Sequence, residues 1–392
     1  MSKHGSARRR PEASSSPRLL FVSTYPPTRC GLANYTQSLV RALSDHRGGL
    51  DGLGVVRLMP PDDPPDENDD LVMARVVPGR PGWLKSVRAA SAGFHILCLQ
   101  HEYGIFGPDD GLAVLDLIES VDLPVMLTLH TVPRDPSDRQ RQILESLVTR
   151  AEVLVVMSHA ARRRLELRYR FDGTLIRVIP HGAHGFHGQA RRSDGRPTIL
   201  TWGLIGPGKG IEWAIHAMRK LRHLEPLPWY LVQGGTHPNV RRRQGETYRR
   251  YLEWLVRSLG VEHMVDLEDG YVDDATLGRM VAGADVVLLP YDSRDQVTSG
   301  VLIEAVAAGK PVVATAFPHA MELLSGGAGV VVPHQDPDAI AEAVARLLGD
   351  RRTLSAAQEA ARHLAGRLEW GSVAAAYEEM VARVARAASG AA

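Results

Sequence analysis

A glycine-rich segment, GLIGPGKG (residues 203–210), lies between an apolar run of strand length and an amphipathic run of helix length. Glycines let backbone N–H groups approach an anion, the start of the following helix adds its dipole, and Lys209 supplies a positive charge. The segment also fits the G-x-x-x-x-G-K pattern of ATPases, but Gly210 stands where a magnesium-binding Ser or Thr is needed. The loop therefore predicts a phosphate site, with a tight turn carrying a surface lysine as the alternative.

A second anion site is predicted at Thr298-Ser299-Gly300, where another helical run begins. Small residues at a helix start leave N–H groups free for a phosphate. Glu304 follows one turn later. Its carboxylate could serve the same ligand, or it could only compensate the helix dipole.

Two histidines end apolar runs in the first half of the chain, His130 in TLHT and His181 in PHG. A lone histidine at a sheet edge is more often structural than catalytic. Two of them at the carboxyl ends of strands in one domain leave a catalytic role for one and a structural role for both equally favoured. The other histidines show no H-E-x-x-H or similar spacing, so no metal site is predicted. An arginine-rich stretch, Arg162–Arg170, is interpreted as a solvated helix face, with docking to an anionic membrane or acceptor as the alternative.

These residues follow short apolar runs that alternate with amphipathic helical runs, which predicts parallel sheets covered on both faces. The expected strands lie at 18–27, 95–100, 125–130, 153–158, 177–182, 198–203, 229–235, 265–270, 284–291 and 311–317. Ligands of such sheets bind at the carboxyl ends of the strands, where this sequence places loops rich in Gly, His and Tyr but poor in carboxylates. Enzymes that use paired carboxylates, or a metal bound by carboxylates, are therefore not favoured.

Five segments are predicted along the 392 residues. They are a disordered leader (1–17), a Rossmann-like domain (18–183), a linker (184–196), a second Rossmann-like domain (197–369) and a last amphipathic helix (370–392). The acidic stretch at 60–70 is predicted to be a surface loop that does not pack.

Composition excludes several classes of protein. Two cysteines exclude a disulfide scaffold and fit a reducing cytoplasm, and a net charge of +1 gives no support for nucleic-acid binding. No run of about 18 apolar residues is present, so no membrane span is predicted. The N-terminus has no apolar stretch after its basic residues and is not a secretory signal. We expect a cytoplasmic protein, with peripheral contact at the inner membrane face as an option.

Six motifs occur in order along the chain: STYPPTRCGLANYT, LQHEYGIFG, LTLHTV, VIPHG, GLIGPGKGIEWAI and SGVLIEAVAAGKPVVAT. Together they resemble a GT-B retaining glycosyltransferase of family 4, in the bacterial branch that serves polysaccharides and related glycoconjugates. The resemblance spans residues 19–386. It implies an α/β fold of two doubly wound domains facing across a cleft, with the last helix crossing back onto the first domain.

The resemblance also implies roles for individual residues. Lys209 would grip the diphosphate of a nucleotide sugar, the amides of Ser299, Gly300 and Val301 would cap it, and Glu304 would bind the ribose. His130 would lie near the transferred sugar. The remaining donor contacts would come from Gly31, Gly203, Gly208 and Gly234, and the acceptor side from Tyr25, Glu102, Tyr103 and His181.

The chain departs from the family pattern at two positions. Leu204 stands where many members have an arginine that completes the cationic clamp, unless Arg294 reaches in. Gln296 stands at the position of a glutamate that contacts the sugar, and the adjacent Asp295 could take over those contacts.

The resemblance implies a hexosyltransferase that retains anomeric configuration through a metal-independent front-face mechanism, without a cofactor. GDP-mannose is the preferred donor on family grounds, and the acceptor is open among a glycan, a lipid-linked molecule and a small metabolite. The alternatives are an inactive GT-B-like protein that binds a glycan or partner, and an ATPase. A dehydrogenase is disfavoured because no strand is followed by G-x-G-x-x-G with an acid about 20 residues on.

Overall fold

The computed structural model describes residues 16–28, 30–60, 63, 69–185 and 194–390. Most of the expected leader, residues 186–193 of the expected linker, and residues 61–62 and 64–68 of the acidic stretch lie outside the described residues.

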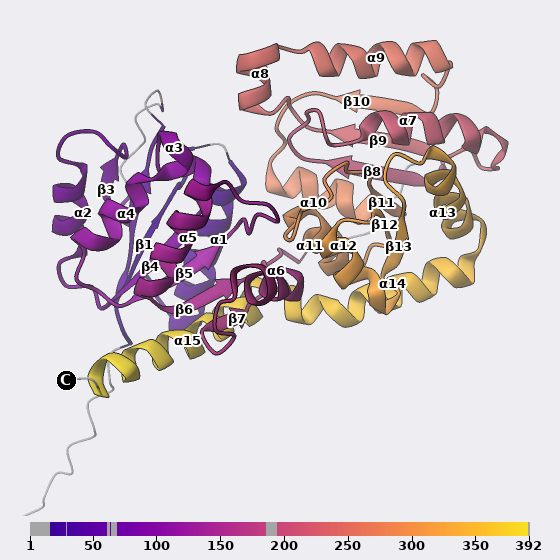
Figure 1. The fold of residues 1–392 in the computed structure, drawn as a ribbon. Coiled ribbons are helices and arrows are strands. Elements are labelled where there is room, and N and C mark those ends of the chain that lie inside the picture. The colour runs from indigo at the N-terminus through magenta and orange to yellow at the C-terminus, as the bar shows by residue number, and fades with distance from the viewer. Residues whose placement is uncertain (1–15, 29, 61–62, 64–68, 186–193, 391–392) are drawn as a thin grey trace, which may run out of the picture.

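Within the described residues, two parallel sheets form two layered domains (Figure 1). The first sheet has the order β3-β2-β1-β4-β5-β6-β7 and the second the order β10-β9-β8-β11-β12-β13. The strands of the first sheet are β1 (Leu19–Ser23), β2 (Leu53–Leu58), β3 (Val72–Val76), β4 (Ile96–His101), β5 (Val125–Leu129), β6 (Ala151–Val156) and β7 (Ile176–Val178). Those of the second are β8 (Thr198–Trp202), β9 (Trp229–Gln233), β10 (Val265–Glu268), β11 (Val286–Leu289), β12 (Val312–Thr315) and β13 (Gly329–Val332).

Helices connect the strands and cover the sheets. The first domain has α1 (Gly31–Arg47), α2 (Trp83–Ser91), α3 (Pro108–Gly111), α4 (Ala113–Ser120), α5 (Asp138–Arg150) and α6 (His159–Arg164). The second half of the chain has α7 (Ile211–Lys220), α8 (Pro238–Gln244), α9 (Thr247–Leu259), α10 (Asp274–Gly283), α11 (Gly300–Ala307), α12 (Pro318–Leu323), α13 (Pro337–Gly349), α14 (Arg351–Leu368) and α15 (Trp370–Gly390).

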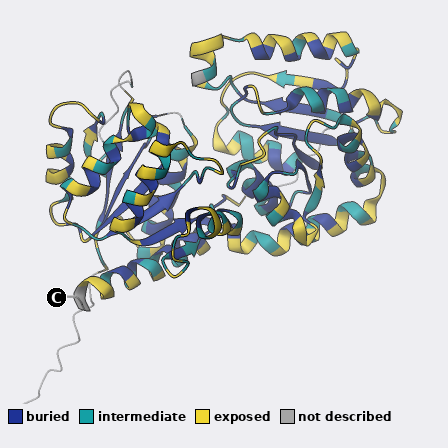
Figure 2. Ribbon diagram, viewed as in Figure 1, coloured by how far each residue is buried: buried dark blue, intermediate teal, exposed yellow. Residues whose placement is uncertain are grey.

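The central strands are buried along their whole length, as Figure 2 shows by their dark blue ribbons. Strands β1, β5 and β8 contain no exposed residue, because helices pack on both faces of each sheet. Apolar clusters lie on both faces of the first sheet and on both faces of the second. The predicted α/β doubly wound fold is therefore confirmed.

Each sheet reverses its strand order once, between β1 and β4 in the first and between β8 and β11 in the second. Loops that leave two such neighbouring strands diverge, which opens a crevice at the carboxyl edge where ligands of this fold class bind. The segment 203–210, which we call the glycine-lysine loop, follows β8, and the loop that leads to α11 follows β11. In the first sheet, the loop before Gly31 follows β1, and Glu102 follows β4.

The chain crosses back from the second domain to the first between α14 and α15. Glu369 takes an extended conformation that breaks the helix, and α15 then packs on α1 (Figure 1). The Ala183 N–H donates to the Leu368 carbonyl (2.6 Å), and the Trp370 N–H donates to the Ala183 carbonyl (3.3 Å). The predicted returning helix is thus present, and its start is fixed to the chain that leaves the first sheet.

The strand expected at 177–182 is shorter than predicted, because β7 ends at Val178 and Pro180 has no N–H for a ladder. The domain limits at 183/184 and 196/197 stay predictions, and they fall between β7 and β8. None of the described helices is both long enough and apolar enough to cross a membrane.

Candidate functional site

The glycine-lysine loop and the loop after β11 are joined at the edge of the second sheet. The Asp292 N–H donates to the Gly208 carbonyl (2.9 Å), and the Lys209 N–H donates to the Gly206 carbonyl (3.1 Å). The Lys209 ammonium lies 4.3 Å from the ring centroid of Tyr291, which follows β11. This cation–π contact places the positive charge between the two loops of the β8/β11 crevice.

Two glycines at this edge cannot be replaced without moving backbone. A Cβ on Gly210 (φ 63°) would lie 1.8 Å from the Pro290 carbonyl oxygen, and a Cβ on Gly234 (φ 155°) would lie 1.8 Å from the Gly203 oxygen. Position 210 therefore has no room for the magnesium-binding Ser or Thr of an ATPase loop. A Cβ on Gly203 would lie 3.7 Å from Val301 Cγ2, so the starts of the lysine loop and of α11 adjoin.

The N-terminus of α11 offers two amides rather than the three expected. The Ser299 hydroxyl accepts from the Leu302 N–H (3.3 Å) as the helix cap, while the Ser299 N–H donates to Nδ1 of His319 (2.9 Å). Within the described residues, the N–H groups of Gly300 and Val301 make no hydrogen bond. Such unsatisfied amides at a helix start are suited to an anion.

Glu304 lies one turn into α11 and accepts a hydrogen bond from the Trp202 indole N–H at Oε2 (3.2 Å). Burial raises the pKa of this carboxyl to about 7, and the nearby Asp274 charge adds to the increase, while the indole hydrogen bond opposes it. The carboxyl group is thus on the same side as the free amides of α11 and titrates near neutral pH.

His130 follows β5 at the edge of the first sheet. Its Nε2 lies 2.8 Å from Oε1 of Gln100, and its ring meets the Tyr35 ring edge-on at 4.8 Å between centroids. Burial lowers the pKa of His130 to about 3, with smaller contributions from His181 and His101. The imidazole is therefore neutral at physiological pH and cannot act there as a cationic clamp.

His181 lies where the two domains touch. Its Nδ1–H donates to the Gly182 carbonyl (2.6 Å), and Nε2 lies 3.2 Å from the point that a Cβ on Gly300 would occupy. Burial lowers the pKa of His181 to about 4. A neutral histidine of the first domain thus packs against the first residue of α11.

The loop that contains Asp295 and Gln296 approaches the first domain through the Asp295 backbone and Val297. One guanidinium nitrogen of Arg164, in α6, donates to the Val132 carbonyl (2.7 Å) and to the Asp295 carbonyl (3.0 Å). Val297, 4% exposed, packs into the apolar cluster of the first domain. The Gln296 amide donates to the Thr298 carbonyl within its own loop (3.0 Å). The Asp295 loop therefore lies beside the chain that follows His130.

The residues expected on the acceptor side do not all face the sheet edge. Glu102 accepts from the Thr131 hydroxyl and from the Tyr103 N–H (3.0 Å), and burial raises the pKa of its carboxyl. The side chains of Tyr25 and Tyr103, 2% and 7% exposed, lie in the apolar clusters on opposite faces of the first sheet. We therefore do not place these two tyrosine rings among the substrate contacts.

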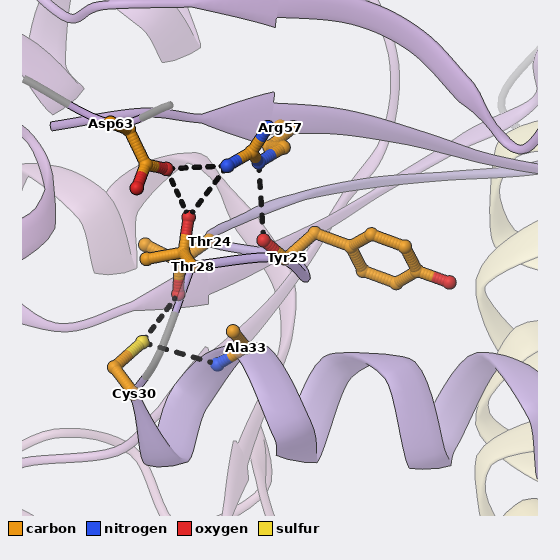
Figure 3. Close-up of polar contacts among 7 residues, drawn as sticks. All are labelled: Thr24, Tyr25, Thr28, Cys30, Ala33, Arg57 and Asp63. Carbon is orange, nitrogen blue, oxygen red and sulfur yellow. Dashed lines mark hydrogen bonds and ion pairs between the residues drawn. The ribbon is translucent and has the colours of Figure 1, made fainter. Parts of the chain in front are cut away.

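The loop that leads to Gly31 is held by a buried ion pair (Figure 3). Arg57, in β2, is fully buried and pairs with Asp63. Its guanidinium also donates to the Tyr25 carbonyl (3.1 Å) and to the Thr28 hydroxyl (3.0 Å), which in turn donates to Asp63 (2.5 Å). Asp63 belongs to the acidic stretch expected not to pack, so that expectation is wrong for this residue: a buried guanidinium requires its carboxylate.

Gly31 itself is the first residue of α1. Cys30 caps this helix through Sγ, which accepts from the Ala33 N–H (3.4 Å) and lies 3.3 Å from the Thr24 hydroxyl. A Cβ on Gly31 would meet nothing within 4 Å, so the loop presents open backbone there. Asn34, one turn into α1, donates to the hydroxyl of Tyr271 in the second domain (3.2 Å).

The arginine-rich stretch 162–170 is not one uniform surface. Arg162 pairs with Glu166 (2.8 Å), and Arg164 makes the bridge to Asp295 described above. The other arginines of the stretch are exposed, and so is Leu167, at 76%. Contact between this surface and a membrane stays a prediction.

Two elements of the site were not predicted from the sequence. His319 follows β12, so the rule that singled out His130 and His181, a histidine just after a strand, could have found it. Arg164 was grouped with its neighbours as surface charge, and no local signal distinguishes it. In the described part of the chain, no three His, Cys, Asp or Glu residues are grouped as metal ligands.

Comparison with known families assigns both halves of the chain. Residues 30–184 match the family model described as Glycosyltransferase Family 4, and residues 196–350 match the one described as Glycosyl transferases group 1. The two models together match most of the chain, which therefore belongs to the glycosyltransferases. This confirms the family seen in the motifs, whereas the retaining mechanism and the bacterial branch stay predictions.

Curated relatives match parts of the chain. An uncharacterized glycosyltransferase of Methanocaldococcus jannaschii is 37% identical over 158 residues, which are 40% of this chain and 37% of that protein. The D-inositol 3-phosphate glycosyltransferase of Corynebacterium efficiens is 29% identical over 285 residues, 64% of each protein. The chain thus spans less than two thirds of the length of these relatives.

Solved structures match over nearly the whole chain. Sucrose-phosphate synthase from Thermosynechococcus elongatus superposes with a TM-score of 0.72 at 20% identity, covering 95% of this chain and all of that one. Anabaena HepE in complex with UDP superposes with a TM-score of 0.74 at 15% identity, covering 93% of this chain and all of that one. At these identities the likeness concerns the fold.

Proposed function

We propose that this protein is a glycosyltransferase that moves a hexose from a nucleotide-diphosphate sugar to an acceptor hydroxyl with retention of configuration. The observation that supports it most is the convergence at the β8/β11 crevice. The Lys209 charge, two unpaired amides of α11 and the Glu304 carboxyl lie there together. These groups match a diphosphate and the ribose attached to it.

The neutral histidines of the first domain support the sugar side of the proposal. Arg164 bonds to the Asp295 carbonyl and to the Val132 carbonyl, just after His130, which supports a site shared by the two domains. In a front-face reaction, the bond from the sugar carbon to the phosphate oxygen breaks, and the acceptor oxygen bonds to the same face of that carbon. The acceptor proton passes to the departing phosphate oxygen, whose growing charge Lys209 and the α11 amides stabilise.

We propose that the reaction needs no metal ion and no cofactor. The positive charge that a metal would otherwise bring comes from Lys209 and the start of α11. Because Leu204 is not basic and Arg294 is exposed, we expect Lys209 to be the main side-chain cation on the diphosphate. Activity should therefore persist in EDTA.

GDP-mannose remains the donor we favour, and a UDP-sugar is the competing donor, because HepE was solved with UDP and with UDP-glucose. For the acceptor, the name D-inositol 3-phosphate glycosyltransferase, borne by several relatives, favours a small phosphorylated hydroxyl compound over a glycan or a lipid-linked acceptor. A nucleotide-diphosphate screen by melting temperature separates the donors, since a ligand at about 100 times its Kd adds about 2.7 kcal/mol of stability.

The test of the function is the Lys209→Ala variant. We expect turnover of the sugar nucleotide identified by the screen to fall about 10²- to 10³-fold, as for removal of one electrostatic stabiliser. Lys220→Ala is the matched control, because Lys220 lies at the end of α7 and pairs with Asp338 on the surface. Equal turnover of both variants would contradict the assignment of Lys209. A wild type that binds nucleotide but transfers no sugar would favour the inactive, glycan-binding alternative.

A further inference from the structure

A chain of buried hydrogen bonds runs from the returning helix α15 to the ring of His130. The Tyr377 hydroxyl, in α15, lies 3.0 Å from the Tyr35 hydroxyl and 3.0 Å from Oγ1 of Thr128 in β5. The Gln100 amide nitrogen, in β4, donates to the same Thr128 oxygen (3.4 Å). The amide oxygen of Gln100 lies 2.8 Å from Nε2 of His130.

The members of this chain are shielded from water. Gln100 and Thr128 are 0% exposed, Tyr377 is 1% exposed and Tyr35 is 2% exposed. A buried donor or acceptor left unpaired costs about 1–3 kcal/mol, so groups that satisfy each other favour a common arrangement. In this arrangement the Gln100 amide is held by Thr128 as well as by His130.

That orientation decides the tautomer of His130. Because the Gln100 NH₂ group faces Thr128, its carbonyl oxygen faces His130 and can only accept. Nε2 of the neutral ring must then carry the proton, and Nδ1 keeps its lone pair. Within the described residues, Nδ1 makes no hydrogen bond.

We propose that Gln100 and Tyr377 are positioning residues that hold His130 as its Nε2–H tautomer and offer Nδ1 to a hydroxyl of the transferred sugar as an acceptor. This role rests on the function proposed above. The donor sugar must then carry a free hydroxyl that faces Nδ1 and donates to it, because Nδ1 of this tautomer has no proton to donate. It also makes α15 a support of the sugar side as well as a link between domains.

The first test reads the tautomer directly and needs no sugar nucleotide. Two-bond ¹H–¹⁵N spectra of the full chain with ¹⁵N-labelled histidine, with His130 assigned through His130→Asn, distinguish the two tautomers. We expect Nε2–H in the wild type. Gln100→Met, which removes the acceptor, should give a mixture of the two tautomers.

The end of the hydrogen-bond chain farthest from His130 is tested with Tyr377→Phe, which removes the hydroxyl and keeps the packed ring. Tyr230→Phe is the matched control, because the buried Tyr230 hydroxyl bonds to Thr201 (2.9 Å) in the second domain. We expect Tyr377→Phe to shift the His130 signals and Tyr230→Phe to leave them unchanged. Unaltered His130 signals in both Tyr377→Phe and Gln100→Met would overturn the proposal.

The second test is kinetic. We expect Gln100→Met to lower kcat for sugar transfer about fivefold, the factor for one hydrogen bond of about 1 kcal/mol, and Tyr230→Phe to leave kcat unchanged. A role in packing alone would lower the melting temperature without changing the His130 tautomer. A wild type with the Nε2–H tautomer but no turnover contradicts the proposed function, whereas turnover with an Nδ1–H tautomer contradicts the positioning role.

Discussion

Removing the carboxylate of Asp63 should destabilise the first domain strongly, although Asp63 belongs to a stretch rich in surface charge. Its partner Arg57 is 0% exposed, and the Asp63 side chain is 11% exposed. Breaking a buried ion pair from one side costs about 3–5 kcal/mol, because the other charge is left without compensation. The domain has roughly 160 residues, so each kcal/mol lowers Tm by about 2–4 °C, and Asp63→Ala should lower it by about 6–20 °C.

The assay is calorimetric unfolding of the full chain, with Asp70→Ala as the control. Asp70 is an exposed acid of the same stretch. We expect the control to stay within about 0.5 kcal/mol of the wild type, as surface substitutions usually do. The double variant Arg57→Met/Asp63→Leu should recover part of the loss, since it removes both charges and leaves no buried guanidinium unpaired.

Two outcomes would refute this reasoning. Equal melting temperatures for Asp63→Ala and Asp70→Ala would mean that the pair does not stabilise the fold. A double variant less stable than Asp63→Ala would mean that Arg57 contributes through its bonds to Tyr25 and Thr28 more than its desolvation costs.

The remaining predictions concern two glutamates. Burial raises the pKa of Glu304 from 4.5 to about 7. Protonation of this carboxyl therefore stabilises the folded state fully below pH 4.5, and the stabilisation is lost as the pH rises through about 7. Glu304→Gln should therefore match the wild-type Tm near pH 5 and exceed it at pH 8; a lower Tm at pH 8 would contradict this. Glu322, in α12, accepts from the N–H groups that begin α6 (2.9 and 2.7 Å). Glu322→Ala should cost about 0.5–2 kcal/mol, as for a lost helix cap, and Glu342→Ala on the exposed face of α13 should not; equal unfolding curves would argue against the cap.

The central strands could be predicted from the sequence because helices bury both of their faces, which makes them continuous apolar runs. Strand β3 was not predicted, because it is not buried on both faces and Met73 is exposed. Strand β2 was not predicted for a different reason. It is buried throughout, but it carries Arg57, and nothing nearby in the sequence indicates that Asp63 neutralises that charge.

For the candidate site, the backbone features could be predicted and the side-chain directions could not. Glycines with positive φ and a small residue at a helix start are local signals, and Gly210 and Ser299 carry them. The burial of Tyr25 and the bridge from Arg164 to Asp295 depend on packing between distant segments. Arg164 and Asp295 are 131 positions apart, and no periodicity of the sequence encodes such a contact.

The contact between Tyr377 and Thr128 joins residues 249 positions apart, and it changes how the returning helix should be tested. Helix α15 packs its apolar side on α1, so deleting the helix would expose that core and remove the hydroxyl at the same time. Lost activity after truncation could then come from unfolding, from separation of the domains or from a misplaced His130. Tyr377→Phe separates these causes, because it leaves the apolar contacts and the turn at Glu369 intact. If that variant loses no more stability than the control Tyr230→Phe but loses sugar transfer, α15 contributes to the site through the orientation of His130.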